Sequence, residues 1–589
     1  GKNMPNILEK INEPKDLREC SIDELNTLAE EIRECIIKKV DTVGGHLGPN
    51  LGFVEPTIAM HYVFNTPKDK FVFDVSHQCY PHKILTGRKE YYTNPEKYHE
   101  ISGYTNPKES EHDSFFIGHT STSVSLSVGL AKARDLKREK SNIVAVIGDG
   151  SLSGGEAFEG LDNAAALGSN IIIVVNDNDM SIAPNYGGIY GNLQLLKETD
   201  GKAECNFFKA MGFDYKYVAD GNNVEKLIKV FEEVKDINHP VIVHLHTLKG
   251  KGLAVAEQNK ETFHWILPKT VENFGKQQGE EPESYNSLTK NFLLKKREKD
   301  NTVIAISPAT PGVYGFTPDF REKLGEGYTD VGICEEHAIA YSSGLAANGA
   351  KPVLSIMSSF IQRTYDQLSQ DLALNSNPAT ILVWWGGISG GDATHLGCFD
   401  IPLISNIPNI IYLSPAYKEE YLKMLEWSVE QTQYPIAIRV PFGNIESCGE
   451  DNTDYSILNK FKVEIAGKDI AIIGAGNFLH LGKKVLATLK EKFGIHATLI
   501  NPRFISGLDK ELLENLKQSH KLVITLEDGV KDGGFGEKVA SFYGNSDIKV
   551  LNYGAEKEFT DRVPLEELYQ RYHLTPELIA EDVAKTLNI

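Results

Sequence analysis

The residues between Gly148 and Asn178 carry the pattern that points most directly to chemistry. One apolar run ends in a GDG turn at 148–150, and a second ends about thirty residues later in an NDN turn at 176–178. The two runs predict strands joined by a helix. In a parallel strand–helix–strand unit the turns that follow both strands meet at one edge of the sheet. We therefore expect Asp149 and Asn178 to lie close together.

The chemistry expected where these turns meet is the binding of a metal-bound diphosphate. Carboxylate and amide oxygens are hard ligands that suit Mg²⁺ or Ca²⁺. Gly148 and Gly150 would let backbone amides approach a phosphate. The GDG turn alone is more typical of an ordinary strand–turn–helix unit. With the NDN turn at this spacing, the stretch resembles the thiamine diphosphate motif.

Three histidines lie in polar turns that precede expected helices. His46 lies in the glycine-rich stretch TVGGHLGPNLG, His77 follows the expected strand 71–75, and His119 precedes an apolar helix. Their spacing is not that of a zinc site, and no local set of carboxylates or cysteines joins them. They fit better as hydrogen-bond donors and proton carriers around an anionic substrate.

Other candidate residues have weaker patterns. Lys249, in a KGKG turn, could contact a phosphate, although lysines in such turns are usually solvated. Glu335 begins an expected helix and could be only a capping carboxylate. Phe360 and Arg363 follow another strand, and a glycine-rich loop contains Asp392 and His395.

Composition limits the class of protein. The 589 residues are too many for one core, so we expect two to four domains. A formal net charge of −20 argues against a general binder of nucleic acid or anionic membranes. No apolar run approaches the length of a membrane span, and the N-terminus shows no signal-peptide pattern. The seven cysteines include no CxxC pair, which favours a reduced, cytoplasmic protein.

Strand and helix patterns alternate along the chain, which predicts an α/β fold in three domains. The boundaries that we expect are 1–285, 300–450 and 460–589. Helical periodicity runs through 7–40, with a capping box at Ser21 and Glu24. Residues 179–206 have a loop-like composition, and the polar stretch 269–300 is typical of an interdomain linker.

The whole chain resembles the 1-deoxy-D-xylulose-5-phosphate synthase family of transketolase-like, thiamine diphosphate-dependent enzymes. The motifs that carry the resemblance stand in family order over residues 42–444: GGHLGPNLG, DVSHQCYPHKILTGR, GHTSTSVS, GDG…NDNDMSI, HTLKGKG…AE…FH, CEEHA, SSFIQRTYDQ, GGDATHLGCFD and PIAIRVPFGN. The resemblance implies two thiamine-diphosphate-binding α/β domains, the diphosphate-binding one first and the pyrimidine-binding one second. A transketolase-type C-terminal domain would follow them.

The resemblance also implies roles for individual residues. Mg²⁺ would be bound by Asp149, Asn178 and the backbone of Met180. Glu335 would hydrogen-bond the pyrimidine ring of the cofactor, and Phe360 would pack against that ring. The implied cofactor-binding set is His77, Gly118, His119, Thr120, Gly148, Asp149, Gly150, Ser151, Asn178, Lys249, Glu335 and Phe360. The implied catalytic set is Glu335, His46, His264, Asp392 and His395, and the implied substrate contacts are His46, Arg363, Arg439, Asp392 and His395.

The activity that the resemblance implies is that of a transferase of isoprenoid biosynthesis. Pyruvate would lose CO₂, and its remaining two-carbon fragment would join glyceraldehyde 3-phosphate to give 1-deoxy-D-xylulose 5-phosphate. The implied protein is a cytoplasmic homodimer whose active site forms between the first two domains. Its partners would be small-molecule substrates, with no nucleic acid and no membrane.

The sequence departs from the family pattern where the aldehyde's phosphate is bound. Trp385 and Phe442 stand where the family has arginines, while Arg363 and Arg439 remain. Neither aromatic side chain can supply the charge that a phosphate dianion recruits. Three alternatives stay open: a true synthase that binds the phosphate in a new way, a synthase-like enzyme for a different aldehyde that is more apolar or unphosphorylated, and a transketolase that transfers two-carbon ketol units.

Overall fold

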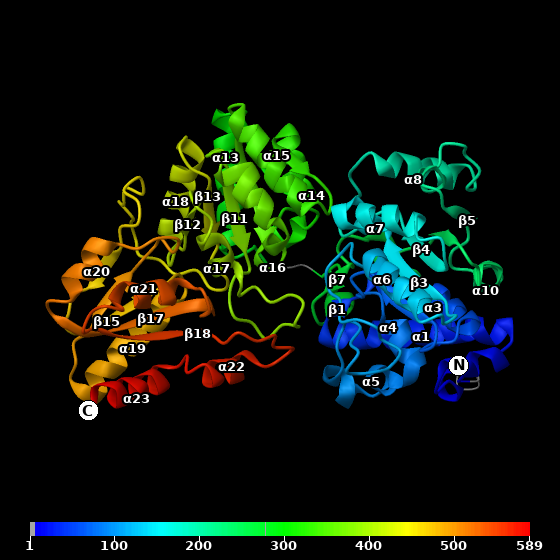
Figure 1. Cartoon of the computed structure of the whole chain (residues 1–589), viewed down its shortest axis with the longest axis horizontal. Coiled ribbons are helices and arrows are strands. Elements are labelled where there is room, and N and C mark those ends of the chain that lie inside the picture. The colour runs from blue at the N-terminus through cyan, green and yellow to red at the C-terminus, as the bar shows by residue number, and fades with distance from the viewer. Residues whose placement is uncertain (1–5, 277–278) are drawn as a thin grey trace. The chain divides into compact units, whose positions relative to one another are not determined.

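The computed structural model describes residues 6–276 and 279–589 (Figure 1). The chain divides into two compact units, which are described separately. The first contains the described residues up to Gly279 together with Gly332–Cys334, and the second contains Glu280–Val331 and Glu335–Ile589.

The first unit is built on a five-stranded parallel sheet in the order β2-β3-β4-β6-β5. The strands are β2 (Lys70–Phe73), β3 (Ile143–Gly148), β4 (Ile171–Asp177), β5 (Asp214–Val218) and β6 (Pro240–His246). A separate antiparallel pair joins β1 (Gly45–His46) to β7 (Trp265–Ile266). The helices are α1 (Ile22–Val43), α2 (Gly48–Leu51), α3 (Val54–Val63), α4 (Tyr80–Lys83), α5 (Glu90–Thr93), α6 (Ser123–Leu136), α7 (Gly155–Ala165), α8 (Ile189–Glu198), α9 (Phe207–Ala210), α10 (Val224–Val234), α11 (Ala254–Gln258) and α12 (Thr270–Asn273).

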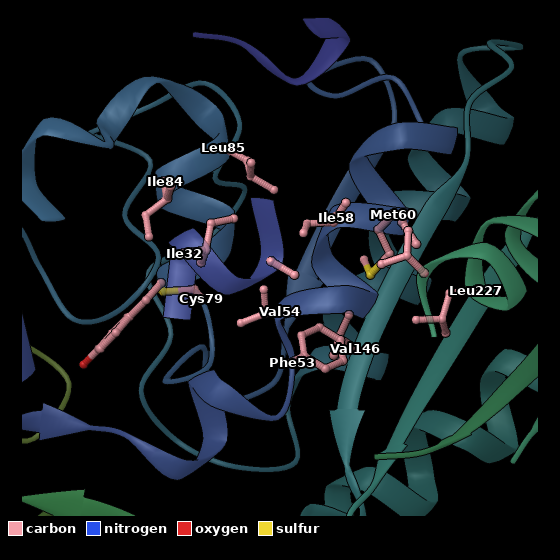
Figure 2. Packing of buried hydrophobic residues seen from close by; sticks show 14 of the residues in the cluster. Ile32, Phe53, Val54, Ile58, Met60, Cys79, Ile84, Leu85, Val146 and Leu227 are labelled. Atoms are coloured by element: carbon pink, nitrogen blue, oxygen red, sulfur yellow. The ribbon is translucent and has the colours of Figure 1, made fainter. Parts of the chain in front are cut away.

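Helices cover both faces of this sheet, because successive side chains of a strand point to opposite faces. Along β3, Val144 and Val146 belong to a core cluster with α1, α3 and α10, whereas Ala145 and Ile147 belong to a cluster with α6, α7 and α8. Figure 2 shows part of the first cluster, with Phe53 beside Val146. With both faces covered, the turns that follow the strands are left at the edges of the sheet.

Two expectations for the first unit need correction. The expected strand 71–75 ends at Phe73, because Val75 and Ser76 take positive φ angles that no strand continues. The supposed loop 179–206 contains α8, whose Leu193 and Leu196 are buried against the sheet. The capping box of α1 is confirmed, with Ser21 and Glu24 each accepting the other's backbone N–H.

The second unit contains two sheets. The first has six parallel strands in the order β12-β13-β11-β10-β8-β9, and the second has five in the order β14-β16-β15-β17-β18, of which only β14 runs antiparallel. The strands are β8 (Val303–Ser307), β9 (Tyr328–Asp330), β10 (Lys351–Met357), β11 (Thr380–Trp384), β12 (Ile411–Leu413), β13 (Ile436–Arg439), β14 (Lys462–Ile465), β15 (Asp469–Gly474), β16 (Thr498–Asn501), β17 (His520–Val530) and β18 (Lys549–Ala555).

Helices flank both sheets of the second unit (Figure 1). They are α13 (Tyr285–Lys299), α14 (Pro318–Leu324), α15 (Glu335–Ala347), α16 (Ser358–Ile361), α17 (Asp400–Ser405), α18 (Lys418–Glu430), α19 (Phe478–Phe493), α20 (Lys510–Leu516), α21 (Phe535–Tyr543), α22 (Leu565–Arg571) and α23 (Pro576–Leu587). The linker expected over 269–300 is wrong for its second half, because α13 buries Tyr285 and Leu293 in the core beside β8. The expected α/β fold class is confirmed.

Among the described residues, no helix combines the length and the apolar character that a bilayer crossing requires.

Candidate active site

The turns that follow β3 and β4 bring three oxygen-bearing groups together. The parallel register places Gly148 opposite Asn176, so both turns leave the same edge of the sheet. One atom of the Asn178 amide group lies 2.5 Å from the Met180 carbonyl oxygen and 3.2 Å from Asp149 Oδ1. If this atom is the amide nitrogen, it donates a hydrogen bond to each of the two oxygens. If it is the amide oxygen, three oxygen atoms converge here, an arrangement that a bound hard cation stabilises. The predicted meeting of Asp149 and Asn178 is confirmed.

The electrostatics of Asp149 fit a cation at this point. Asn185 Nδ2 donates to Asp149 Oδ2 at 2.6 Å. Burial and the nearby charge of Asp177 raise the pKa of Asp149 well above its usual range. The charges of Lys197 and Lys249 do not offset the burial of this carboxyl, and Mg²⁺ would supply further positive charge. The described part of the chain holds no cluster of three His, Cys, Asp or Glu that could bind a metal, so the donors that fit are one carboxylate, one amide and one carbonyl.

Three residues that the sequence analysis missed hold these turns in place. Tyr190 donates its hydroxyl to the carbonyls of Asp149 at 2.9 Å and Gly150 at 3.2 Å. Lys197 Nζ donates to Asp177 Oδ1 at 3.0 Å and also pairs with Asp179. Tyr190 and Lys197 lie on α8, and Asn185 lies just before it. The apolar spacing of Ile189, Leu193 and Leu196 is the sequence pattern that could have revealed the helix.

The two glycines of the GDG turn are favoured for different structural reasons. A Cβ atom at Gly150 would lie 2.2 Å from the Cβ of Ser181, so the packing of the turn after β4 requires glycine there. A Cβ atom at Gly148 would meet no atom within 4 Å. The open space beside Gly148 fits the approach of a phosphate to the backbone.

The turn that contains Gly118, His119 and Thr120 is fixed beside Ser151. Asp74, just after β2, accepts the backbone N–H groups of Ser121 at 2.9 Å and Ser123 at 3.0 Å, and the Ser121 hydroxyl donates to the Ser151 carbonyl at 2.9 Å. The turn thus leads into the first residues of α6. No sequence pattern distinguishes Asp74 from other residues that follow a strand.

The structure gathers His46, His77 and His264 from three distant segments. The ring centroids of His46 and His77 are 5.0 Å apart, those of His46 and His264 are 5.4 Å apart, and those of His77 and His264 are 5.5 Å apart. Asn50 is buried, and its amide donates to the carbonyls of His46 and His77, each at 2.8 Å. Imidazoles at these distances can share one anionic substrate as donors.

Lys249 is buried next to this histidine group, so the interpretation as a solvated lysine is wrong. Its Nζ donates to the Ser181 carbonyl at 2.5 Å and lies 2.8 Å from His264 Nδ1. Burial lowers the pKa of Lys249 to about 7. Burial and the neighbouring Lys249 hold the pKa of His264 well below its usual value. A bound phosphate would restore the charged form of this lysine.

In the second unit, Glu335 is the first residue of α15 and is only 4% exposed. Its Oε1 lies 3.7 Å from Arg363 Nη1, whereas its buried Oε2 has no hydrogen-bond partner among the described residues. Burial raises the pKa of Glu335 to about 7. An orphaned buried carboxyl oxygen fits a nitrogen heterocycle as its partner.

The two residues before Glu335 belong to the first unit. Ile333 N donates to Ser153 Oγ at 3.2 Å, and Cys334 Sγ lies 3.0 Å from the Ser153 carbonyl oxygen. Ser153 closes the turn that Asp149 opens after β3. Both contacts therefore lie within the first unit.

Phe360, Asp392 and His395 lie close together. The ring centroids of Phe360 and His395 are 5.7 Å apart, and His395 Nδ1 lies 3.5 Å from Asp392 Oδ1. Burial alone would raise the pKa of Asp392, but hydrogen bonds from His395 and Thr394 lower it to about 2. Asp392 is therefore the carboxylate partner of His395.

Arg439 takes a different place from the one expected. It is 7% exposed, and its guanidinium binds Asp400 through Nε at 2.8 Å and Nη2 at 3.1 Å. Nη2 also donates to the Asp528 carbonyl at 2.7 Å. Because the guanidinium N–H groups already bind Asp400 and the Asp528 carbonyl, we do not include Arg439 in the substrate site proposed below.

Trp385 and Phe442 form an exposed aromatic pair after β11 and β13. Their ring centroids are 5.9 Å apart, and their side chains are 45% and 60% exposed. Trp385 has a φ of +58°, which is uncommon for a bulky residue and is typical of strained backbone at functional sites. The pair lies at the carboxyl ends of adjacent parallel strands, where ligands of α/β sheets bind.

Comparison with known proteins finds family models that match most of the chain. The family model for 1-deoxy-D-xylulose-5-phosphate synthase matches residues 8–203 and 197–247. The models for the transketolase pyrimidine-binding domain and the transketolase C-terminal domain match 284–446 and 459–579. The 1-deoxy-D-xylulose-5-phosphate synthase of Halothermothrix orenii is 37% identical over 627 aligned residues, which cover 99% of this chain and 98% of the relative. The enzyme of the same name from Alkaliphilus oremlandii is 36% identical, with 99% of each chain covered.

Proposed function

Because the chain belongs to the 1-deoxy-D-xylulose-5-phosphate synthase family, we propose that it condenses pyruvate with an aldehyde and releases CO₂. The family reaction uses glyceraldehyde 3-phosphate as the aldehyde and gives 1-deoxy-D-xylulose 5-phosphate, a precursor for isoprenoid biosynthesis. The cofactors are thiamine diphosphate and Mg²⁺. The fold is the three-domain transketolase-like fold, and we propose its domains as 1–285, 300–450 and 460–589.

The observation that carries the proposal is the convergence of the Asp149 carboxyl, the Asn178 amide and the Met180 carbonyl, where burial raises the pKa of Asp149. These three groups would bind Mg²⁺. The turns of Gly118–Thr120 and Gly148–Ser151, together with Lys249 and His77, would hold the diphosphate. When bound, thiamine diphosphate supplies the electron sink for the loss of CO₂ from pyruvate.

The remaining residues divide the binding and proton-transfer work. Glu335 would hold a proton against the pyrimidine ring through its buried Oε2, and Phe360 would pack on that ring. His46 and His264 would donate hydrogen bonds to the anionic substrate. His395, oriented by Asp392, would move protons at the reacting oxygen atoms, and Arg363 would bind the acceptor.

The aromatic pair supports a second candidate function, with an unphosphorylated aldehyde as the acceptor. On this alternative, Trp385 and Phe442 bind an apolar aldehyde, since aromatic rings bury apolar surface but supply no charge for a phosphate.

Arginine substitutions at this pair test the acceptor. In the double variant W385R/F442R, the kcat/KM ratio for glyceraldehyde 3-phosphate over unphosphorylated glyceraldehyde is expected to rise about 10- to 100-fold, because charge-assisted hydrogen bonds to phosphate contribute about 1.5–3 kcal/mol. Ile457→Arg, which adds charge at another exposed apolar residue of the second unit, is the control. An unchanged ratio in W385R/F442R would show that the pair does not face the acceptor.

The transketolase alternative predicts a different donor. A transketolase cleaves a ketose and has no need of pyruvate, so the two activities separate in one assay. The protein with Mg²⁺ and thiamine diphosphate is given pyruvate or a ketose phosphate, and CO₂ and aldehyde release are measured. We expect CO₂ from pyruvate and no aldehyde from the ketose. Ketose cleavage without CO₂ release would favour the transketolase.

We further propose that the protein is a cytoplasmic homodimer. All seven cysteines, each in the described part of the chain, are free thiols, which supports a reducing compartment. The proposed partners are small-molecule substrates, without nucleic acid, in keeping with a net charge of −20.

A further inference from the structure

The loop 385–399 connects β11 to α17 and contains both Asp392 and His395. Within the loop, Thr394 N donates to Asp392 Oδ1 at 2.9 Å, and His395 N donates to the Asp392 carbonyl at 3.2 Å. These short-range bonds shape one tight turn. They do not fix that turn relative to the sheet that precedes it.

Both ends of the loop are bound to β17 of the five-stranded sheet. Ile388 N donates to Asp528 Oδ1 at 2.8 Å. At the other end, Val530 N donates to the Cys398 carbonyl at 2.9 Å. A Cβ atom at Gly387 would lie 2.6 Å from Asp528 Oδ2, so the backbone approaches this carboxyl as closely as glycine permits.

The middle of the loop is bound by the segment between β18 and α22. Asp561 Oδ1 accepts the backbone N–H of Ala393 at 3.1 Å, and Arg562 N donates to the Gly391 carbonyl at 2.9 Å. Ala393 lies between Asp392 and Thr394, so the Asp561 carboxylate holds the turn that bears His395 at its centre. Of the two contacts, only the one from Asp561 uses a side chain, and it can therefore be removed by substitution.

We propose that Asp561 is a positioning residue for Asp392 and His395. On this proposal, the contacts from β17 and from the segment between β18 and α22 hold their loop in the geometry that the reaction requires. Four backbone groups of the loop are fixed by residues that lie at least 130 positions later in the chain. Reacting groups must be held to within a fraction of an ångström of their productive geometry. This inference rests on the proposed function, in which His395 contacts the substrate.

The test compares two substitutions of the same side chain. D561A removes the acceptor, whereas D561N keeps an oxygen at the same place. We expect kcat/KM to fall about 10- to 100-fold in D561A, the effect of misplacing reacting groups by about 1 Å, and to stay within about threefold of the parent in D561N. D561L, which lacks an acceptor but leaves no cavity, should match D561A. D532A, at an exposed carboxylate in the turn after β17, is the control for lost charge.

Two further readouts separate positioning from general damage. Amide hydrogen exchange in the peptide 388–398 should accelerate in D561A and not in D532A. The affinity for thiamine diphosphate, measured by Mg²⁺-dependent fluorescence quenching, should stay within about twofold of the parent in every variant, because a loop turn and not the fold is disturbed. Unchanged exchange in D561A, or equal losses in D561A and D561N, would overturn the inference.

A double variant distinguishes failure of this inference from failure of the proposed function. If D561A acts through His395, its effect should disappear in an H395A background. Equal, additive losses in both backgrounds would overturn the positioning role while leaving His395 in place. Full activity of H395A itself would instead contradict the proposed function.

Discussion

Replacing Glu335 by alanine is expected to lower kcat for CO₂ release from pyruvate by about 10²- to 10⁴-fold, the contribution typical of a positioned acid or base. Glu335 is buried, and its Oε2 has no partner in the described part of the chain, so no other side chain there already serves that oxygen. E322A, which removes an exposed carboxylate of α14, is the control and should retain full activity. An E335A enzyme with parental turnover would remove Glu335 from the mechanism.

The variant Glu335→Gln tests the buried carboxyl of Glu335 through folding stability instead of activity. Burial raises the pKa of Glu335 from its usual 4.5 to about 7. Between these two pH values the unfolded chain releases this proton while the folded chain keeps it, so the carboxyl lowers folding stability as pH rises through this window. Glutamine has no such proton. The free energy of unfolding of E335Q, relative to the parent, should therefore grow by roughly 3 kcal/mol between pH 4 and pH 8. A pH-independent difference would show that Glu335 is not buried as described.

Replacing Asp149 by alanine is expected to weaken Mg²⁺-dependent binding of thiamine diphosphate by at least about 100-fold, since the variant loses the one carboxylate among the three metal donors. The readout is thermal stabilisation of the protein by the cofactor. At about 100 times its Kd, thiamine diphosphate with Mg²⁺ should stabilise the parent by about 2.7 kcal/mol, and D149A at the same concentration by a few tenths.

Two comparisons make this result specific to the metal. D162A removes an exposed carboxylate of α7 in the same unit and should keep the parental stabilisation. Without Mg²⁺, the parent itself should show little stabilisation by the cofactor. Equal stabilisation of D149A and the parent would contradict the assignment of Asp149 as a metal ligand.

The part of the site that the sequence predicted best is the part that strand periodicity determines. Asp149 and Asn178 follow two apolar runs in a parallel unit, so their meeting required only the alternation of strand and helix and the common edge of the sheet. The gathering of His46 and His77 was expected from their turns, but the distances between them depend on contacts such as those of the buried Asn50 amide.

The parts that could not be predicted depend on long-range contacts. Nothing in the KGKG turn indicates that Lys249 is buried, because its partner Ser181 belongs to another turn. Arg439 ends β13, a position typical of a substrate-binding residue, yet its bidentate partner Asp400 lies in α17. The sequence of α13 resembles a linker because most of its residues are polar, and only a few side chains such as Leu293 are buried.

The most direct test of the account is to identify the product made from pyruvate and glyceraldehyde 3-phosphate with Mg²⁺ and thiamine diphosphate. With pyruvate labelled by ¹³C at its carbonyl carbon, the account predicts one CO₂ for each molecule of 1-deoxy-D-xylulose 5-phosphate, with the label at the new ketone carbon seen by NMR. Absence of CO₂ release and of any labelled ketose, with every aldehyde tested, would contradict it.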